Sequence, residues 1–338
     1  MKTRHYWKTY HEAKLNYFLK VWGLALLIVN EAGDPWRKSK RGRRPKFTSK
    51  MHAAICIFMK YFDLTYRDIE GSSELLIKLQ IDHSTVGWAM KRIPVNYVKK
   101  AIRNLNFRIS ELCSEGAFIV DSTGIKTDRE VEGRFILEKR EKKEFLKLHV
   151  LVKYFPNEGL LSVANAHVTK SNRHDSPIFR NKLLTEEVAE KDTVIFGDKA
   201  YYAFANFEKI YGLGMKPVIP PKNWKSKSMT KRTLRRRALF DYNNGLRKKF
   251  RGMIEGVFGG LETEYGNKTR CRNHHTRNIS VLLLALSHNL KAYQKALTIK
   301  RLQISPVRRK KAVLLAAFAA KGKNACALFL IYSTTPVS

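Results

Sequence analysis

Two aspartates follow apolar runs that are typical of buried strands. Residues 117–120 run into Asp121, and residues 193–196 run through Gly197 into Asp198. An ionised carboxylate at the end of such a strand is costly unless it is paired, hydrogen-bonded or bound to a cation. A salt bridge explains either aspartate alone in a chain with 65 Lys and Arg residues. Two of them at equivalent strand ends favour a site for a hard divalent ion such as Mg²⁺.

The elements that must position these aspartates follow from the apolar pattern. Residues 145–155 and 160–168 predict two strands joined by a turn at 156–159, which places a hairpin beside the first strand. Helices are predicted over 176–190, 203–211, 247–265 and 280–297, and a short last strand over 216–219. This order predicts an α/β domain over residues 111–300, with a mixed sheet, flanking helices and a basic insertion near 224–246.

The first 110 residues predict a helical region with a basic break. Residues 15–29 are apolar enough for one buried helix, and residues 48–62 carry apolar residues at helical spacing. Residues 37–50 hold eight Lys and Arg and no acid. A short helix over 65–70, a turn at 71–73 and a helix capped by Asp82 or Ser84 give the outline of a helix-turn-helix. A plain helical scaffold gives the same outline, so the pattern by itself leaves DNA binding and scaffolding open.

Composition favours a nucleic-acid partner. The 338 residues carry a formal net charge of +36, which a polyanion would neutralise, so nucleic acid is the first expectation and a membrane surface the second. No apolar stretch is long enough to cross a bilayer, and no signal peptide is expected. The four cysteines form no C-x-x-C pair, which excludes a zinc ribbon and favours a reducing, cytoplasmic location.

Three segments together resemble a known family. Ile-Val-Asp-Ser-Thr-Gly at 119–124, Gly-Asp-Lys-Ala-Tyr at 197–201 and Arg251-x-x-x-Glu255 are similar to the catalytic segments of DDE transposases from prokaryotic insertion sequences, in the superfamily of the insertion-sequence four and five groups. The acids stand 77 and then 57 residues apart, and the resemblance spans roughly residues 40–295. Residues 168–169 and 174–176 also stand where this family usually has such a pair of segments.

The resemblance implies a fold, a site and a reaction. It implies a ribonuclease-H-like domain preceded by a DNA-binding region, with Asp121, Asp198 and Glu255 as catalytic ligands of two Mg²⁺ ions, for which Mn²⁺ can substitute. Such an enzyme binds the terminal inverted repeats of its own element as double-stranded DNA, cuts phosphodiester bonds and transfers the 3′-OH ends to target DNA. A homodimer in the DNA complex, no membrane and a nucleoid location go with this function.

The sequence departs from the family pattern near the third acid. Lys248 stands where the superfamily often has a tyrosine, and Glu262 stands where it has a lysine, so the family roles of that tyrosine and lysine are not transferred. Glu255 and Glu262 are two helical turns apart and share a face, while Glu264 is the weakest candidate. Apolar neighbours would anchor the helix at Glu255, which makes it the preferred ligand. Residues 301–338 form an extension of unknown role.

The predicted DNA contacts are basic residues in the two basic segments and in the third motif: Arg37, Lys38, Arg41, Arg43, Arg44, Arg235, Arg236, Arg237 and Arg251. Arg251 lies one turn before Glu255, so it could contact a phosphate or pair with that glutamate. His149 and His167 stand on adjacent predicted strands, where a structural role is favoured over zinc.

Two other functions remain open from sequence. One is a catalytically inactive, sequence-specific DNA-binding protein that keeps the acids as structural relics. The other is a ribonuclease-H-like nuclease that cuts without strand transfer.

Overall fold

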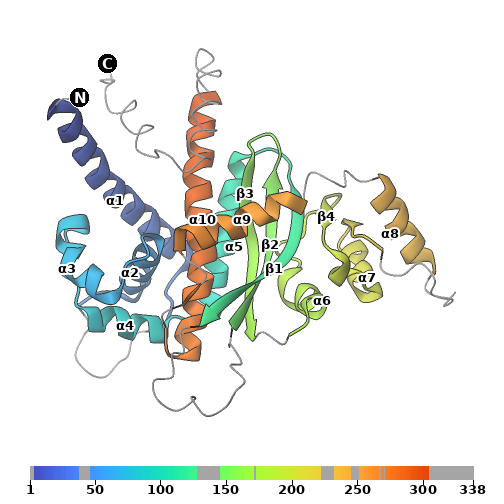
Figure 1. Ribbon diagram of the computed structural model, residues 1–338, viewed down its shortest axis with the longest axis horizontal. Coiled ribbons are helices and arrows are strands. Elements are labelled where there is room, and N and C mark those ends of the chain that lie inside the picture. Colours follow the sequence, from blue (N-terminus) through green and yellow to red (C-terminus); the bar gives the residue numbers. More distant parts are fainter. Residues whose placement is uncertain are drawn as a thin grey trace, which may run out of the picture.

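The computed structural model describes residues 4–37, 46–127, 145–170, 173–221, 232–244, 251–265, 268–269 and 271–303. Five helices come first: α1 (Arg4–Ala32), α2 (Ser49–Tyr61), α3 (Tyr66–Ile77), α4 (His83–Arg92) and α5 (Val95–Leu112). A sheet region follows, with helices packed against it (Figure 1). Within these ranges no helix is long and apolar enough to cross a membrane.

Caps set helix ends in the first region, and α1 extends beyond the predicted residues 15–29 at both ends. Gly33 ends α1 with a positive φ of 87°, and Thr48 caps α2 by accepting a hydrogen bond from the Met51 amide. Thr65 and Asp68 form a reciprocal capping box at the start of α3. Asp82, rather than Ser84, caps α4.

The predicted turn at residues 71–73 is wrong, because α3 continues through it to Ile77. Ile69, Ser73 and Ile77 are buried at four-residue spacing, so one face of the helix stays in the core and outweighs the weak propensity of Gly71. The connection to α4 is therefore residues 78–82. In place of the expected short helix, turn and capped helix, the structure has the longer α3 followed by the capped α4.

The sheet has the strand order β3-β2-β1-β4-β5, with the short β6 (Lys268–Thr269) pairing with the end of β1. The strands β1 (Ala117–Thr127), β2 (Phe145–Phe155) and β3 (Leu160–Lys170) are antiparallel neighbours, which confirms the predicted hairpin. The strands β4 (Val194–Phe196) and β5 (Lys216–Val218) run parallel to β1. The fold is therefore a mixed α/β sheet with flanking helices, as expected.

One strand boundary differs from the prediction. Asp121 does not end its strand, since β1 continues to Thr127. The cause is β2, because ten of its eleven residues pair with β1, as far as Lys126. On the other side, the paired residues of β4 end opposite Ile119, so Asp121 lies just past the end of that short ladder.

The helices between and after the strands also differ in part. The predicted helix over 176–190 is reduced to α6 (Asp175–Ile178) and a wider π-helical turn, η1 (Phe179–Leu183). The Asn165 side-chain amide donates hydrogen bonds to the carbonyls of Lys182 and Leu183. These carbonyls at the end of the turn therefore have partners although the helix does not continue.

Four further helices complete the described part of the sheet region. A helix within the basic insertion, α8 (Arg232–Asn244), was not predicted, and it packs against β5 and the expected α7 (Phe204–Gly212). The predicted helix over 247–265 is α9 (Arg251–Tyr265), and the one over 280–297 is the longer α10 (His274–Gln303).

Two apolar cores lie on the two faces of the sheet. Ile119, Leu148 and Val150 belong to the larger core, which they share with α1, α2, α5, α9 and α10. Phe118 and Val120 alternate with them and belong to the smaller core, with residues of η1, α7 and α8.

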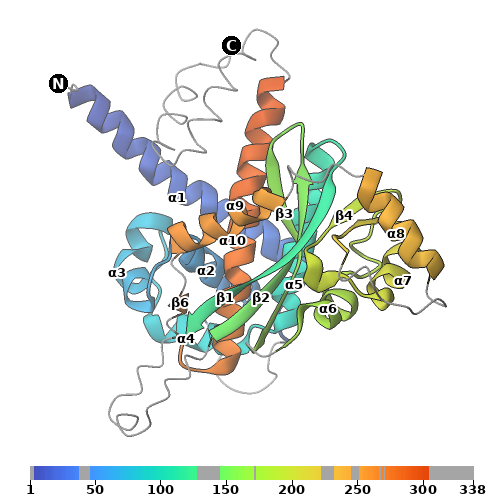
Figure 2. The same cartoon turned by 45° about the vertical axis from the view of Figure 1, so that its right-hand side comes forward.

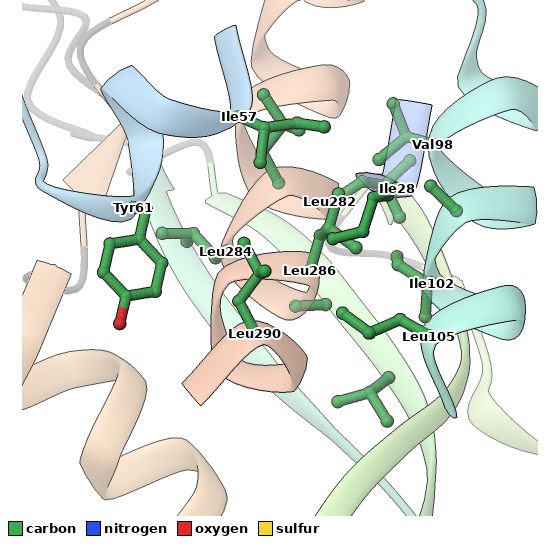
Figure 3. Packing of buried hydrophobic residues seen from close by; sticks show 14 of the residues in the cluster. Ile28, Ile57, Tyr61, Val98, Ile102, Leu105, Leu282, Leu284, Leu286 and Leu290 are labelled. Carbon is green, nitrogen blue, oxygen red and sulfur yellow. The ribbon is translucent and has the colours of Figure 1, made fainter. Parts of the chain in front are cut away.

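The long helix α10 joins the N-terminal helices to the sheet (Figure 2). Its residues Leu282, Leu286 and Leu290 pack among side chains of α2 and α5, including Ile57 and Leu105 (Figure 3). The larger core is therefore continuous across residue 110. The predicted DNA-binding region shares this core with α10, the last helix described.

Candidate active site

The parallel pairing of β1 and β4 brings the two predicted aspartates together. Ile119 pairs with Phe196, and Asp121 and Asp198 each lie two residues further along their own segments. Because side chains alternate along extended chain, each aspartate is on the face of its neighbour two residues back. Ile119 and Phe196 both contribute to the larger core, so both carboxylates belong to the face covered by α9 and α10.

Local hydrogen bonds orient both carboxylates, which are half-buried. Asp121 Oδ1 accepts a hydrogen bond from the Ser122 amide at 2.8 Å. Asp198 Oδ1 accepts one from the Ala200 amide at 2.8 Å and so caps the short 3₁₀ turn η2 (Lys199–Tyr201). Gly197 directly precedes Asp198. A Cβ added at Gly197 would lie 3.1 Å from Val120, which is a tight contact.

The pKa of Tyr201 indicates that three acidic side chains lie near its phenol. Burial raises the pKa of its phenol well above the usual value, and the negative charges of Asp175, Asp121 and Asp198 raise it further. The ring is 1% exposed. Three carboxylates thus act on one phenol, which keeps its proton throughout the range in which proteins function.

Asp175 is the acid that the sequence interpretation left without a role. Its carboxylate accepts hydrogen bonds from Ser122 Oγ and Lys147 Nζ, both at 2.8 Å, and lies 3.0 Å from His149 Nδ1. Burial alone would raise its pKa, but these three partners outweigh burial and hold the pKa well below its usual value. The resemblance had marked residues 174–176, yet only the sheet brings Lys147 and His149 to them.

The third predicted ligand, Glu255, lies on α9, which packs against β1 and crosses α10 towards the strands (Figure 1). Ile254, Val257 and Leu261 anchor this helix in the larger core, and Glu255 is exposed beside them. Glu264 makes a salt bridge with Lys291 of α10 instead. It stands nine residues from Glu255, about 180° round the helix, so it faces away from the side that carries Glu255.

The three predicted ligands suit a divalent cation in donor type, since all are carboxylates. Their oxygens do not all lie within 4.8 Å of one another; in the part of the chain described, the group of three that does is Glu70, Asp82 and His83. Two ions about 4 Å apart need ligands spread over a wider volume than one ion does. In the other group, Glu70 already accepts a hydrogen bond from His83 Nδ1 at 2.9 Å, which holds α3 to α4.

The predicted DNA contacts are placed only in part. Arg37 is exposed just after α1, while Lys38, Arg41, Arg43 and Arg44 lie outside the described residues. On α8, Arg235 is half-buried and Arg236 and Arg237 are exposed; the Arg237 guanidinium lies 4.3 Å from the centre of the Tyr211 ring. Arg251 is the first residue of α9, and its side chain is outside the described part.

The two strand histidines pair across β2 and β3, as expected, but bond to different partners. His149 Nε2 is 2.8 Å from Thr169 Oγ1, and His167 Nδ1 is 2.5 Å from Lys99 Nζ. Both therefore act within the packing of strands and helices, which agrees with the structural interpretation.

Comparison with known proteins finds one matching family and one uncharacterized relative. The transposase DDE domain family matches residues 113–290, which run from the end of α5 into α10 and contain all three predicted acids. An uncharacterized protein of Aquifex aeolicus (strain VF5) is 22% identical over 265 residues, covering 76% of this chain and 81% of that protein.

Proposed function

The chain belongs to the transposase DDE domain family, and from this premise we propose that it binds the terminal inverted repeats of its own mobile element, cuts phosphodiester bonds there and transfers the 3′-OH ends to target DNA. Membership of the family makes it a transposase that cuts nucleic acid with divalent metal. The observation that carries the finer proposal is the placement of Asp121 and Asp198 at matching positions on adjacent parallel segments.

In this proposal Asp121, Asp198 and Glu255 hold two Mg²⁺ ions, with Mn²⁺ as a substitute. When bound, the ions supply an activated oxygen nucleophile and neutralise charge on the phosphate. The chain positions the carboxylates: β1 carries Asp121, Asp198 caps the turn η2, and α9 carries Glu255 on an exposed position beside its buried side. Arg251, one turn before Glu255, is proposed to contact a phosphate of the DNA.

The sheet order supports assignment to the ribonuclease-H-like folds. Three antiparallel strands, β3-β2-β1, are followed by β4 and β5, which run parallel to β1. Asp121 and Asp198 lie where β1 and β4 meet. The further assignment to the insertion-sequence four and five superfamily rests on the three motifs. It remains part of the proposal.

We place recognition of the repeats in residues 1–110, with α3 and α4 as the helix-turn-helix and residues 37–50 on phosphates. Lys91 and Arg92 are exposed at the end of α4, and Arg92 stacks on Trp88 at 4.3 Å from the ring centre. The net charge of +36 provides the electrostatic attraction. Two ends must be joined in one event, so a homodimer on DNA at the nucleoid is part of the proposal.

Cleavage by aspartate variants of the full-length protein tests the proposal. Asp121→Asn and Asp198→Asn should each abolish Mg²⁺-dependent cutting of a DNA duplex that carries the element's end, while binding to that duplex stays intact. The amide keeps the size of the side chain and removes the charge that holds the metal. Ca²⁺ should not support cutting, because its looser geometry misplaces the phosphate.

Asp192→Asn is the matched control. Asp192 precedes β4, is 89% exposed on its side chain and has a positive φ that asparagine tolerates, so this variant should cut normally. Retained cutting in Asp121→Asn or Asp198→Asn would refute the proposed site. Cut ends that are never joined to a second DNA would instead identify a nuclease without strand transfer.

A further inference from the structure

Two consecutive residues of α6, Asp175 and Ser176, make hydrogen bonds that link this helix to the segments carrying Asp121 and Asp198. Asp175 accepts a hydrogen bond from Ser122 Oγ at 2.8 Å, and Ser122 directly follows Asp121. Ser176 Oγ accepts one from Asn206 Nδ2 at 2.9 Å, and the same amide donates to the Tyr201 carbonyl at 2.8 Å. Tyr201 closes the turn that Asp198 caps. The short helix α6 is therefore tied to the neighbours of both aspartates.

The sheet itself does little to fix the spacing of these aspartates. The ladder between β1 and β4 consists of two residue pairs and ends at Ile119 and Phe196, before either acid is reached. Beyond it, Asp198 sits in a short turn rather than in a strand. The connection through α6 supplies the link between the segments that strand pairing leaves out.

The connection is anchored at both of its ends. Asp175 is held from β2 by Lys147 and His149, and His149 in turn bonds to Thr169 of β3. At the other end Asn206 is fully buried. Phe179, which directly follows α6, packs edge-on against Tyr201, with ring centres 5.6 Å apart.

The connection also lies behind the site rather than in it. Ser122 is the neighbour of Asp121 along β1, so its side chain is on the opposite face of the sheet. The oxygens of Asp175 are occupied by Ser122, Lys147 and His149. Asp175 thus acts on the acids through the backbone of β1 and not as a fourth ligand.

We infer that Asp175, Ser176 and Asn206 are positioning residues that fix the separation of Asp121 and Asp198 for divalent metal binding. This inference rests on the proposed function. Mg²⁺ and Mn²⁺ bound by carboxylates demand defined ligand spacing, and loss of groups that orient metal ligands typically lowers metal affinity 10- to 100-fold.

The test measures Mn²⁺ binding to the full-length protein by electron paramagnetic resonance of the free ion. Ser122→Ala and Ser176→Ala each remove one hydroxyl of the connection and leave the Asp175–Lys147 ion pair in place. The double variant should raise the Mn²⁺ dissociation constant about tenfold, and each single variant about threefold. A dissociation constant within about twofold of wild type in the double variant would overturn the inference. If the double variant does not fold, the two single variants decide by the same measurement.

Ser162→Ala is the matched control, because Ser162 is a buried serine that bonds to Asn289 in the larger core, away from α6. It should leave Mn²⁺ binding unchanged while lowering the melting temperature as much as the single test variants do. An equal loss of Mn²⁺ affinity in this control would show a general effect of stability and refute positioning.

Asp121→Asn separates the inference from the proposed function. If it leaves Mn²⁺ binding intact, the proposed metal site is wrong and the inference falls with it. If it abolishes binding while the serine double variant binds as wild type, the proposed function stands and the role of α6 is refuted.

Discussion

The identity of the third acid can be decided on α9 with three matched substitutions. Glu255→Gln, Glu262→Gln and Glu264→Gln make the same chemical change at three positions of one helix. Only Glu255→Gln should eliminate metal-dependent cleavage. The other two variants should cut at rates within about threefold of wild type, a difference of less than 1 kcal/mol.

Helix geometry gives the reason. Glu255 and Glu262 lie about 100° and 80° round from Ile254, on one flank of the buried stripe, but are separated by about 10 Å along the axis. Two metal ions in such a site would lie only about 4 Å apart, so a site with a ligand from one of these positions would be out of reach of the other. Glu264 lies on the opposite flank, in its salt bridge with Lys291.

The contacts at the C-terminal end of α9 favour Glu255 over Glu262 as the metal ligand. Tyr265 fixes the C-terminal end of α9 beside α2 and α10, since Lys60 Nζ and Lys291 Nζ lie 5.7 and 4.7 Å from its ring centre. Glu262 is close to that end. Glu255 is in the half of the helix that lies towards the strands.

The magnitudes follow from the roles. Loss of a ligand carboxylate removes about 4 kcal/mol of transition-state stabilisation, which is a rate decrease of about 10³-fold. Glu264→Gln breaks a partly exposed ion pair and should cost at most about 1 kcal/mol of folding stability without changing the rate. Single-turnover cleavage of end DNA measures the rates. A 10³-fold loss in Glu262→Gln with normal cutting by Glu255→Gln would refute the assignment.

Three other predictions concern stability and DNA binding. Asn289→Ala should lower the free energy of unfolding by about 2–4 kcal/mol in urea titrations, because its amide bonds to the Val163 amide at 2.6 Å and carbonyl at 2.7 Å on edge strand β3. Lys91→Ala should weaken binding to all DNA sequences and reduce the slope of log affinity against log salt by about one in fluorescence anisotropy. Stability should fall as pH drops from about 6.5 towards 4, because burial lowers the pKa of His167 and of His288 to about 4, so the unfolded chain takes up these protons first. The melting temperature of a His167→Gln, His288→Gln double variant should depend less on pH between about 6.5 and 4 than that of the wild type.

Much of the local structure could be predicted from the sequence. The strands around Asp121 and Asp198 were recognisable because apolar runs and turn residues are local signals, and capping by Thr48, Thr65 and Asp82 is a contact between near neighbours. The order and spacing of the three acidic motifs likewise stand in the chain itself. They pointed to a transposase before any arrangement in space was known.

Other features depended on neighbours far along the chain. The strand β1 runs past Asp121 because β2 pairs with it, and α3 runs through Gly71 because one side of it is buried. The π-helical turn after α6 ends where Asn165 of β3 takes its carbonyls. In each case a contact across the fold overrides the preference of the local residues.

The sequence by itself supplied the residues that we propose to carry the chemistry, since the segments around Asp121, Asp198 and Glu255 resemble those of a known family. Only the tertiary structure decided how they are held. It put Asp121 and Asp198 on one face through a two-pair ladder, and it turned Asp175 from an unassigned acid into the link between their segments. The physical reason is that a carboxylate's partners are chosen by proximity in space. Lys147, 28 residues from Asp175 along the chain, comes within hydrogen-bond distance of it only once β2 and α6 pack together.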